Sequence, residues 1–511
     1  MLTSRAVRPA HAKSLRARVA AAALALLGGA AGAPAEGPPS GRLYVVLWFD
    51  TEDYILPPSD DAAKRVAELL TRQGVRATFK VVGEKARTLE RRGRQDVIAA
   101  LARHEIGYHS NTHSQHPTPA EYEASLDWAT GVGEFDRRER PGFDDVRRVL
   151  GQTPSCYGQP GSSWAPQSYA ALQKWGVKVY LDEGRQVGLD GKPFWYGGLL
   201  NIFNTKEGSE LHPNDDWSNV AQARERFREF YDRMTTRPEG GLVSFYFHPC
   251  EFIHREFWDG VNFARGANPP REDWKLPPMK APEESERAFR YLEELVAYIK
   301  SLPRARFITA SEALGIFKDD AQGRTYTPED LLRIARRVEP EVSFQVHDRF
   351  TLAASEVFAL LNRHVARLAR KAPVGPLVLD GTPFGPASPF EGGGAVGADV
   401  AWSQLSRAVA DVAEYLEKNR QIPDAVWLGS TPVSPESYLV ALAQVTLGGT
   451  EPPASIHLGP ARLAAGRYVA DDAPELWDWV IFPSGFRAPR LMGLARLQAW
   501  TLKPAQAIPS P

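Results

Sequence analysis

The chain has 511 residues, of which 43% are hydrophobic and 24% are charged, as in ordinary soluble globular proteins. This length is enough for two or three domains. The 61 basic and 62 acidic residues nearly cancel, and no block of like charges occurs, which argues against a nucleic-acid partner. The only two cysteines, Cys156 and Cys250, do not make a disulfide scaffold, and two buried thiols are favoured over a bridge between them.

The first 35 residues are typical of a secretory signal peptide, with a basic, Ala-rich tail as the alternative. Basic residues precede a short apolar run from Val19 to Leu27, and small residues follow as far as Ala35. The run is shorter than a membrane span, and we expect no other span in the mature chain. Removal of this segment takes five positive charges from a chain of net charge −1, leaving −6. We therefore expect export to the periplasm or the extracellular space.

Residues 41–316 alternate between strand-like and helix-like patterns. A nearly continuous apolar run begins the region, as expected for a strand that is covered on both faces. The patterns predict strands over 43–49, 77–82, 177–181, 242–247 and 306–309, with a short strand leading into Tyr108, and helices over 60–73, 95–103, 168–175 and 283–301. Repeated units of this kind predict a parallel α/β sheet or barrel.

Polar residues directly follow four of these predicted strands and a further strand expected before Gly158. In α/β barrels the carboxyl ends of the strands form the face on which active sites are built. The residues at these ends are Asp50 to Asp53, His109, Gly158 to Ser162, Asp182 and His248. Their shared position predicts a single pocket.

Two of the clusters contain the residue types that hold and use a divalent metal. Asp50, Glu52 and Asp53 supply carboxylates, and His109 and His113 supply imidazoles four residues apart. A metal that activates water needs such nitrogen and oxygen ligands together with a nearby base. The pair His109 and His113 alone is a weak indication of a metal site, because no Glu follows His109 as in the helical metalloprotease motif.

The motifs together resemble the polysaccharide deacetylase (NodB-homology) family of carbohydrate esterases. The segments that carry the resemblance are Asp50-Thr51-Glu52-Asp53, His109-Ser110-Asn111-Thr112-His113, Gln159-Pro160-Gly161-Ser162-Ser163-Trp164, Asp182 and Phe247-His248-Pro249, in the order and approximate spacing of the family. The resemblance covers about residues 41–316. It implies a deformed (β/α) barrel that binds a divalent metal, commonly zinc, with cobalt, manganese or nickel as alternatives. It also implies removal of acetyl groups from N-acetylated glycans.

Carried over to this chain, the resemblance makes Asp50 the catalytic base and His109 and His113 metal ligands. Glu52 is the preferred carboxylate ligand, because residues i and i+2 of an extended segment face the same way as each other. Asp53 is the alternative ligand and could instead cap a loop. His248 would be the general acid, and Asp182 a helper carboxylate paired with it.

The turn that includes Gln159, Pro160 and Gly161 would bind substrate, together with Trp164 and Trp258. One departure stands out: many family members place an Arg just before the Pro-Gly turn, where it orients the base. Here Tyr157-Gly158-Gln159 occupies that stretch. Gln159 or another side chain replaces the Arg, the base is tuned differently, or activity is reduced. Two other functions remain open: hydrolysis of another non-peptide C–N bond, and glycan binding by a catalytically weakened barrel.

Residues 325–505 are predicted to form an additional mixed α/β domain after the polar linker Lys318 to Gly323. Helix starts at Thr327 and Ser434 are each followed by Pro and acidic residues, which gives a weak internal repeat. The repeat weakly resembles cell-wall-binding repeats, so wall anchoring is a hypothesis for this region. The sequence leaves the oligomeric state open.

Overall fold

A computed structural model describes residues 41–213, 216–373, 375–392, 397–449 and 451–507. The predicted signal peptide, residues 1–35, lies outside the described residues. Within the described ranges, none of the helices combines the length and the apolar character that crossing a membrane requires.

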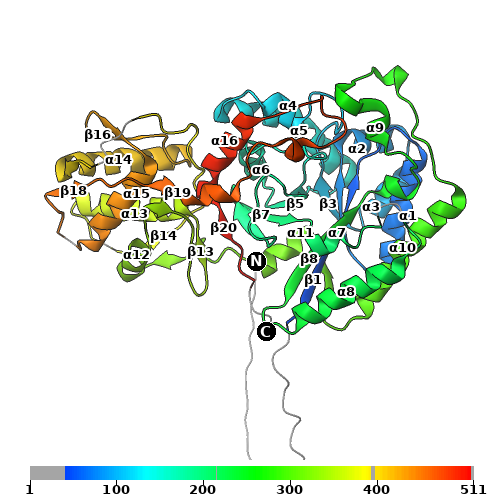
Figure 1. The fold of residues 1–511 in the computed structure, drawn as a ribbon, viewed down its shortest axis with the longest axis horizontal. Coiled ribbons are helices and arrows are strands. Elements are labelled where there is room, and N and C mark those ends of the chain that lie inside the picture. The colour runs from blue at the N-terminus through cyan, green and yellow to red at the C-terminus, as the bar shows by residue number, and fades with distance from the viewer. Residues whose placement is uncertain (1–40, 214–215, 374, 393–396, 450, 508–511) are drawn as a thin grey trace, which may run out of the picture. The chain divides into compact units, whose positions relative to one another are not determined.

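A curled and mainly parallel sheet forms the first part of the fold (Figure 1). Seven of its strands run parallel in the order β7, β5, β4, β3, β2, β1, β8. Their bounds are β1 (Leu43–Thr51), β2 (Thr78–Val81), β3 (Glu105–Tyr108), β4 (Cys156–Tyr157), β5 (Val179–Asp182), β7 (Leu199–Phe203) and β8 (Gly241–Phe247). A further strand, β9 (Ala305–Ile308), pairs with the start of β1. The predicted strands are confirmed to within two residues at each end.

The sheet curls far enough for its parallel edges to meet. The backbone N–H of Thr205, just after β7, donates to the carbonyl of Ser244 in β8 at 3.0 Å. Regular strand pairing between β7 and β8 is otherwise absent from the described sheet. The predicted deformed (β/α) barrel is therefore confirmed.

Helices cover the outside of the curled sheet, each packing against the next in the order α6, α5, α2, α3, α1, α10, α8 (Figure 1). Their bounds are α1 (Pro58–Arg72), α2 (Gly83–Arg91), α3 (Gln95–Leu101), α5 (Trp128–Leu150), α6 (Ser168–Trp175), α8 (Val220–Thr235) and α10 (Pro282–Ser301). The four predicted helices are confirmed. The sequence patterns did not predict α5, whose interior contains Pro141, a residue that normally ends or kinks a helix.

The two faces of β1 pack into different hydrophobic clusters. Leu47 and Phe49 join the large cluster under the outer helices, whereas Val46 and Trp48 join a smaller cluster inside the barrel. Because side chains alternate along a strand, Asp50 continues the inner face of Trp48. The inner cluster also contains Cys156, and both cysteines are buried free thiols, as favoured from the sequence.

The region after the linker is a mixed α/β structure with its own hydrophobic cluster. It contains α12 (Pro328–Ala335), α13 (Ala354–Ala369), α14 (Trp402–Asn419), α15 (Pro435–Leu447) and several two-stranded sheets. The side chains of Thr327 and Ser434 cap α12 and α15, as the two predicted helix starts require. We call residues 325–463 the accessory region.

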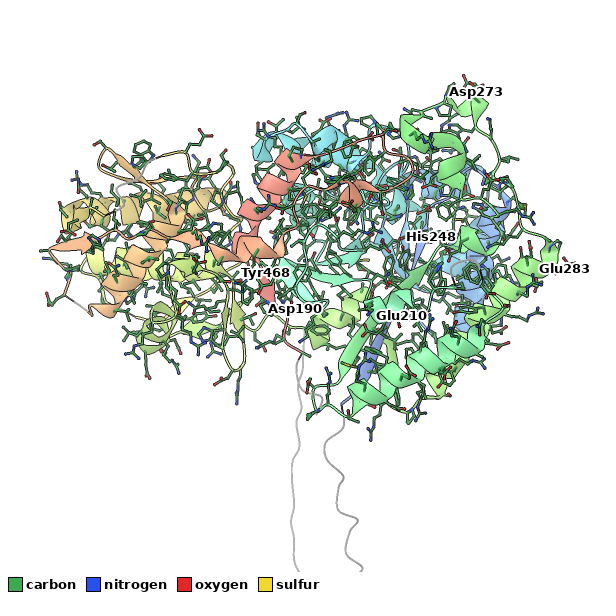
Figure 2. The ribbon with its side chains drawn as sticks, viewed as in Figure 1. Asp190, Glu210, His248, Asp273, Glu283 and Tyr468 are labelled. Atoms are coloured by element: carbon green, nitrogen blue, oxygen red, sulfur yellow. The ribbon has the colours of Figure 1, made fainter. Side chains whose placement is uncertain are left out.

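Residues 464–504, the return segment, follow the accessory region but pack with the barrel. The segment contains α16 (Pro489–Gln498) and β20 (Lys503–Pro504), and β20 pairs antiparallel with β6 (Phe194–Tyr196). Leu476 and Leu491 belong to the same hydrophobic cluster as the barrel. Tyr468, labelled in Figure 2, accepts a backbone hydrogen bond from Gly188. The return segment therefore completes the barrel core.

Candidate active site

A cavity of about 500 Å³ lies at the carboxyl ends of the parallel strands. Its lining includes most of the residues singled out from the sequence: Asp50, Glu52, His109, His113, Gln159, Gly161, Asp182 and His248. His248, labelled in Figure 2, directly follows β8. The structure thus brings strand ends from across the sheet into one pocket, as the polar clusters predicted.

Three donor atoms converge in this cavity as a metal site requires. Oε2 of Glu52 lies 3.0 Å from Nε2 of His113 and 3.2 Å from Nε2 of His109. One donor atom from each residue lies within 4.8 Å of the others. Nε2 of His113 is buried and makes no well-aligned hydrogen bond within the described residues. One carboxylate and two imidazoles suit a divalent transition metal, so the residues fit such an ion.

Neighbouring groups hold the other ends of these three side chains. Nδ1 of His109 bonds to the carbonyl of Gly158 at 3.1 Å, and Nδ1 of His113 bonds to Oγ of Ser114 at 2.7 Å. The indole N–H of Trp258 donates to Oε1 of Glu52 at 2.8 Å. Burial lowers the pKa of His109 and so favours its neutral, ligating form. Such outer contacts fix ligand orientation in metal sites.

The loop that carries the histidines has an unusual backbone. Ser110 (φ 66°) and His113 (φ 53°) both adopt the left-handed conformation, which costs free energy for residues other than glycine. The hydroxyl of Tyr54 donates to the carbonyl of Thr112 at 2.8 Å and helps to hold the loop. This conformation places both imidazoles beside Glu52.

The structure separates the two carboxylates that the sequence left as alternatives. Oδ1 of Asp53 accepts the backbone N–H groups of Ile55 and Leu56 at 2.8 and 3.2 Å. Its other oxygen lies 3.0 Å from Nε2 of His254. Asp53 therefore caps its own loop, and Glu52 alone of the pair joins His109 and His113.

A buried lysine lies beside the predicted base. Lys80 in β2 is 0% exposed, and its Nζ lies 2.9 Å from Oδ1 of Asp50. The same ammonium donates to Oδ2 of Asp182 at 2.5 Å. Burial opposes its charge, but Asp182 and Asp50 outweigh that effect and raise the pKa of Lys80. Sequence reasoning missed this residue, although a lysine within the apolar stretch 77–82 was a usable signal.

His248 faces the same carboxylates from the opposite side of the cavity. Its Nε2 lies 3.9 Å from Oδ2 of Asp50 and 4.0 Å from Oε2 of Glu52, and its side chain is 20% exposed. Burial opposes its positive charge, but Glu52 and Glu251 outweigh that effect and raise the pKa of His248 to about 10. The partner of its Nδ1 is Glu251, at 3.4 Å. The structure thus pairs Asp182 with Lys80 instead of His248.

The residues expected to bind substrate divide into two groups. Gln159 and Gly161 line the cavity. Pro160 lies between them in the turn, and its carbonyl accepts the N–H of Ser163. Trp164 and Trp258 are only 1% and 0% exposed and do not line the cavity. Neither of these rings offers a face to a sugar, and the aromatic lining comes instead from Tyr246, Phe257 and Trp479.

Trp479 brings the return segment into the cavity wall. Its ring lies 5.1 Å from that of His113, and its indole N–H donates to Oδ2 of Asp259 at 2.7 Å. A Cβ at Gly161 would lie 2.2 Å from the Trp479 ring, so the close contact requires glycine there. Burial, followed by the charge of Glu52, raises the pKa of Asp259. Sequence reasoning missed Trp479 and Asp259, because neither lies near a recognisable motif.

Residues 38–180 match the family model described as polysaccharide deacetylase. This part of the chain is similar to the polysaccharide deacetylase family, as its motifs led us to expect. The matched range contains Asp50, Glu52, His109 and His113, whereas His248 lies beyond it. A search of curated proteins finds no match to the chain.

Several solved structures share low-level similarity with the chain. The 4-alpha-glucanotransferase from Thermococcus litoralis is 14% identical, with a TM-score of 0.39, over 54% of this chain and 40% of that protein. The Xyl-CE4 domain of a xylanase from the hindgut metagenome of Trinervitermes trinervoides is 13% identical, with a TM-score of 0.29, over 54% and 90%. The Bc1960 peptidoglycan N-acetylglucosamine deacetylase is 14% identical, with a TM-score of 0.29, over 53% and 90%. This chain thus spans less than half of the glucanotransferase.

Proposed function

We propose that the protein is an exported, metal-dependent hydrolase that removes N-acetyl groups from a polysaccharide or cell-wall glycan. The observation that carries this proposal is the convergence of Glu52, His109 and His113 beside Asp50 and His248 in one cavity. The family match supports glycan deacetylation as the class of reaction.

Glu52 would hold a divalent ion through Oε2, and His109 and His113 through Nε2. Zinc suits this set of nitrogen and oxygen donors, and cobalt, manganese and nickel are alternatives. Such an ion would lower the pKa of a water molecule and polarise the acetyl carbonyl.

Asp50 and His248 would move the protons of the reaction. Asp50 would accept a proton from the attacking water, because its Oδ2 faces the cavity at 3.9 Å from Nε2 of His248. His248 would donate a proton to the sugar nitrogen as the amide C–N bond breaks. The carboxylates around His248 raise its pKa and so favour the protonated form that a general acid needs. Glu251 orients His248 through Nδ1.

Export and the choice of glycan rest on the sequence. The basic segment and apolar run within residues 1–35 support passage through a membrane, which would bring the enzyme to wall or extracellular polymers. Wall retention through the accessory region is a further part of the proposal. Equal retention of full-length and truncated protein on isolated wall material would contradict it.

The decisive experiment measures acetate release from chitooligosaccharides and peptidoglycan by the mature protein with added zinc or cobalt. We expect release by the wild type and its loss in Asp50→Asn and His113→Ala. His457→Ala is the matched control, because this histidine of the accessory region is exposed and pairs only with Asp399 among the described residues.

Other outcomes point to the two alternatives. If the protein binds one metal but releases no acetate from any glycan, hydrolysis of a different non-peptide C–N bond becomes the favoured hypothesis. If it binds glycan in metal-replete form without releasing acetate, the barrel is a carbohydrate-binding module.

A further inference from the structure

The side chain of Lys80 extends across the inner face of the sheet. In the strand register, it lies opposite Asp50 of β1 on one side and Gly107 of β3 on the other. Its ammonium nevertheless contacts Asp182, which ends β5. The side chain therefore crosses β3 and β4 while its Nζ stays 2.9 Å from Asp50.

Two glycines open the path that this side chain takes. A Cβ at Gly107 would lie 3.0 Å from Cγ of Lys80. A Cβ at Gly158, in the turn after β4, would lie 2.0 Å from Nζ of Lys80 and 2.2 Å from Oδ2 of Asp182. Since real Cβ atoms do not approach other atoms so closely, any larger residue at position 158 would displace the ammonium from Asp182.

Gly158 lies in the stretch where the family resemblance leads us to expect an arginine that orients the base. A side chain at position 158 itself would exclude the observed position of the lysine sterically. We infer that Lys80 is the positioning residue for Asp50 and supplies from β2 the positive charge that the missing arginine would supply from the turn. This inference rests on the proposed function, because it assumes that Asp50 is the base.

The contacts explain how a lysine can fix a carboxylate. Asp182 holds the ammonium from one side, and the Trp48 ring lies 4.2 Å from Nζ. The ammonium is thereby confined on two sides before it meets Asp50, which compensates for the flexibility of a lysine stem. With Oδ1 of Asp50 held by Lys80, Oδ2 is left to face His248 and the cavity.

The test replaces Lys80 by methionine, which has a similar length but no charge, in the full mature chain. We expect kcat to fall by about 100-fold, the loss typical of a misplaced catalytic group. KM and the zinc content of one ion per chain should stay within a factor of three of the wild type. Propylammonium added to Lys80→Ala, whose short side chain leaves room for the amine, should restore part of kcat, whereas a purely structural role for Lys80 predicts no such rescue.

The matched control is Lys503→Met. Lys503, in the return segment, is 1% exposed and pairs with Asp319 of the linker and Glu356 of the accessory region, none of which lines the cavity. Its loss should lower stability but leave kcat unchanged. Should Lys80→Met not fold, Lys80→Gln, which removes the charge and keeps a hydrogen-bond donor, carries the same test.

The experiment distinguishes a failure of the role of Lys80 from a failure of the proposed function. An active wild type with an equally active Lys80→Met overturns the role of Lys80 and leaves the proposed function intact. A wild type that releases no acetate with any metal overturns the proposed function. In that case crystal structures of the two proteins decide the positioning role, and an unmoved Asp50 carboxylate in Lys80→Met overturns it.

Discussion

The hydrogen bond from Trp258 to Glu52 predicts a measurable effect on metal affinity. Trp258→Phe keeps a large ring in a fully buried position but removes the N–H that donates to Oε1 of Glu52 at 2.8 Å. The carboxylate would lose a charge-assisted bond and become free to rotate away from His109 and His113. Loss of one such outer contact typically weakens metal binding by about 10- to 100-fold. This corresponds to ~1.4–2.8 kcal/mol.

Competition with a chromophoric zinc chelator measures this effect without any dependence on activity. The matched control is Trp164→Phe, another buried tryptophan, whose indole N–H points to the hydroxyl of Tyr169 at 3.5 Å. The control should lose some stability and keep the zinc affinity of the wild type. Equal zinc affinity for Trp258→Phe and the wild type would refute the assignment of Glu52 as a ligand oriented by Trp258.

Three other predictions concern the cavity wall, the metal and a buried carboxylate. Trp479→Ala should raise KM for oligosaccharides by about tenfold while kcat changes little, because Trp479 contributes an aromatic ring to the cavity wall. Steady-state kinetics checks this, and a fall in kcat alone would contradict it. Removal of zinc by a chelator should abolish acetate release and lower the melting temperature, since an ion at 1,000 times its Kd stabilises the fold by about 4 kcal/mol. Calorimetry with and without zinc measures the shift, and an unchanged Tm counts against binding of the ion by the folded protein. Glu123→Gln should stabilise the protein above pH 5. Both carboxylate oxygens of Glu123 are buried without hydrogen bonds within the described residues. Burial raises the pKa of Glu123 from 4.5 to about 9. Because the folded state takes up the proton more readily than the unfolded state, wild-type stability falls as the pH rises from 4.5 to 9, by up to about 1.4 kcal/mol per pH unit. Denaturant titrations at pH 5 and 8 should show that the advantage of the variant grows with pH. Glu134→Gln, at a half-buried residue that is paired with Arg137 and Arg138, should show no such growth.

The strand ends could be read from the sequence because local patterns determine them. An apolar run followed by Asp50 identifies a covered strand and its carboxyl end, and the alternation of side chains places Asp50 and Glu52 on the same side. The spacing of His109 and His113 likewise identified the loop that joins Glu52. These inferences need only the chain within a few residues of each site.

The remaining parts of the site depend on tertiary packing that no local pattern encodes. Lys80 contacts Asp182 only because Gly107 in β3 and Gly158 just after β4 leave room for its side chain. Asp182 consequently pairs with Lys80, and Glu251 takes the place beside His248 that was expected for Asp182. The sequence led us to expect that Trp258 is exposed and stacks on a sugar. Its indole is instead buried, where it donates a hydrogen bond to Glu52.

The return segment has a consequence for the order in which the protein acquires its parts. Once translation reaches His248, the chain contains every residue that would bind the metal or move a proton. Trp479 leaves the ribosome only after the whole accessory region. The cavity wall and the strand pairing of β20 with β6 therefore close late, through contacts between distant parts of the chain. An incomplete chain that already carries all the chemically active side chains would still lack one side of its cavity. Any fragment that ends at residue 316 should accordingly be regarded as an unfinished barrel rather than as a minimal enzyme.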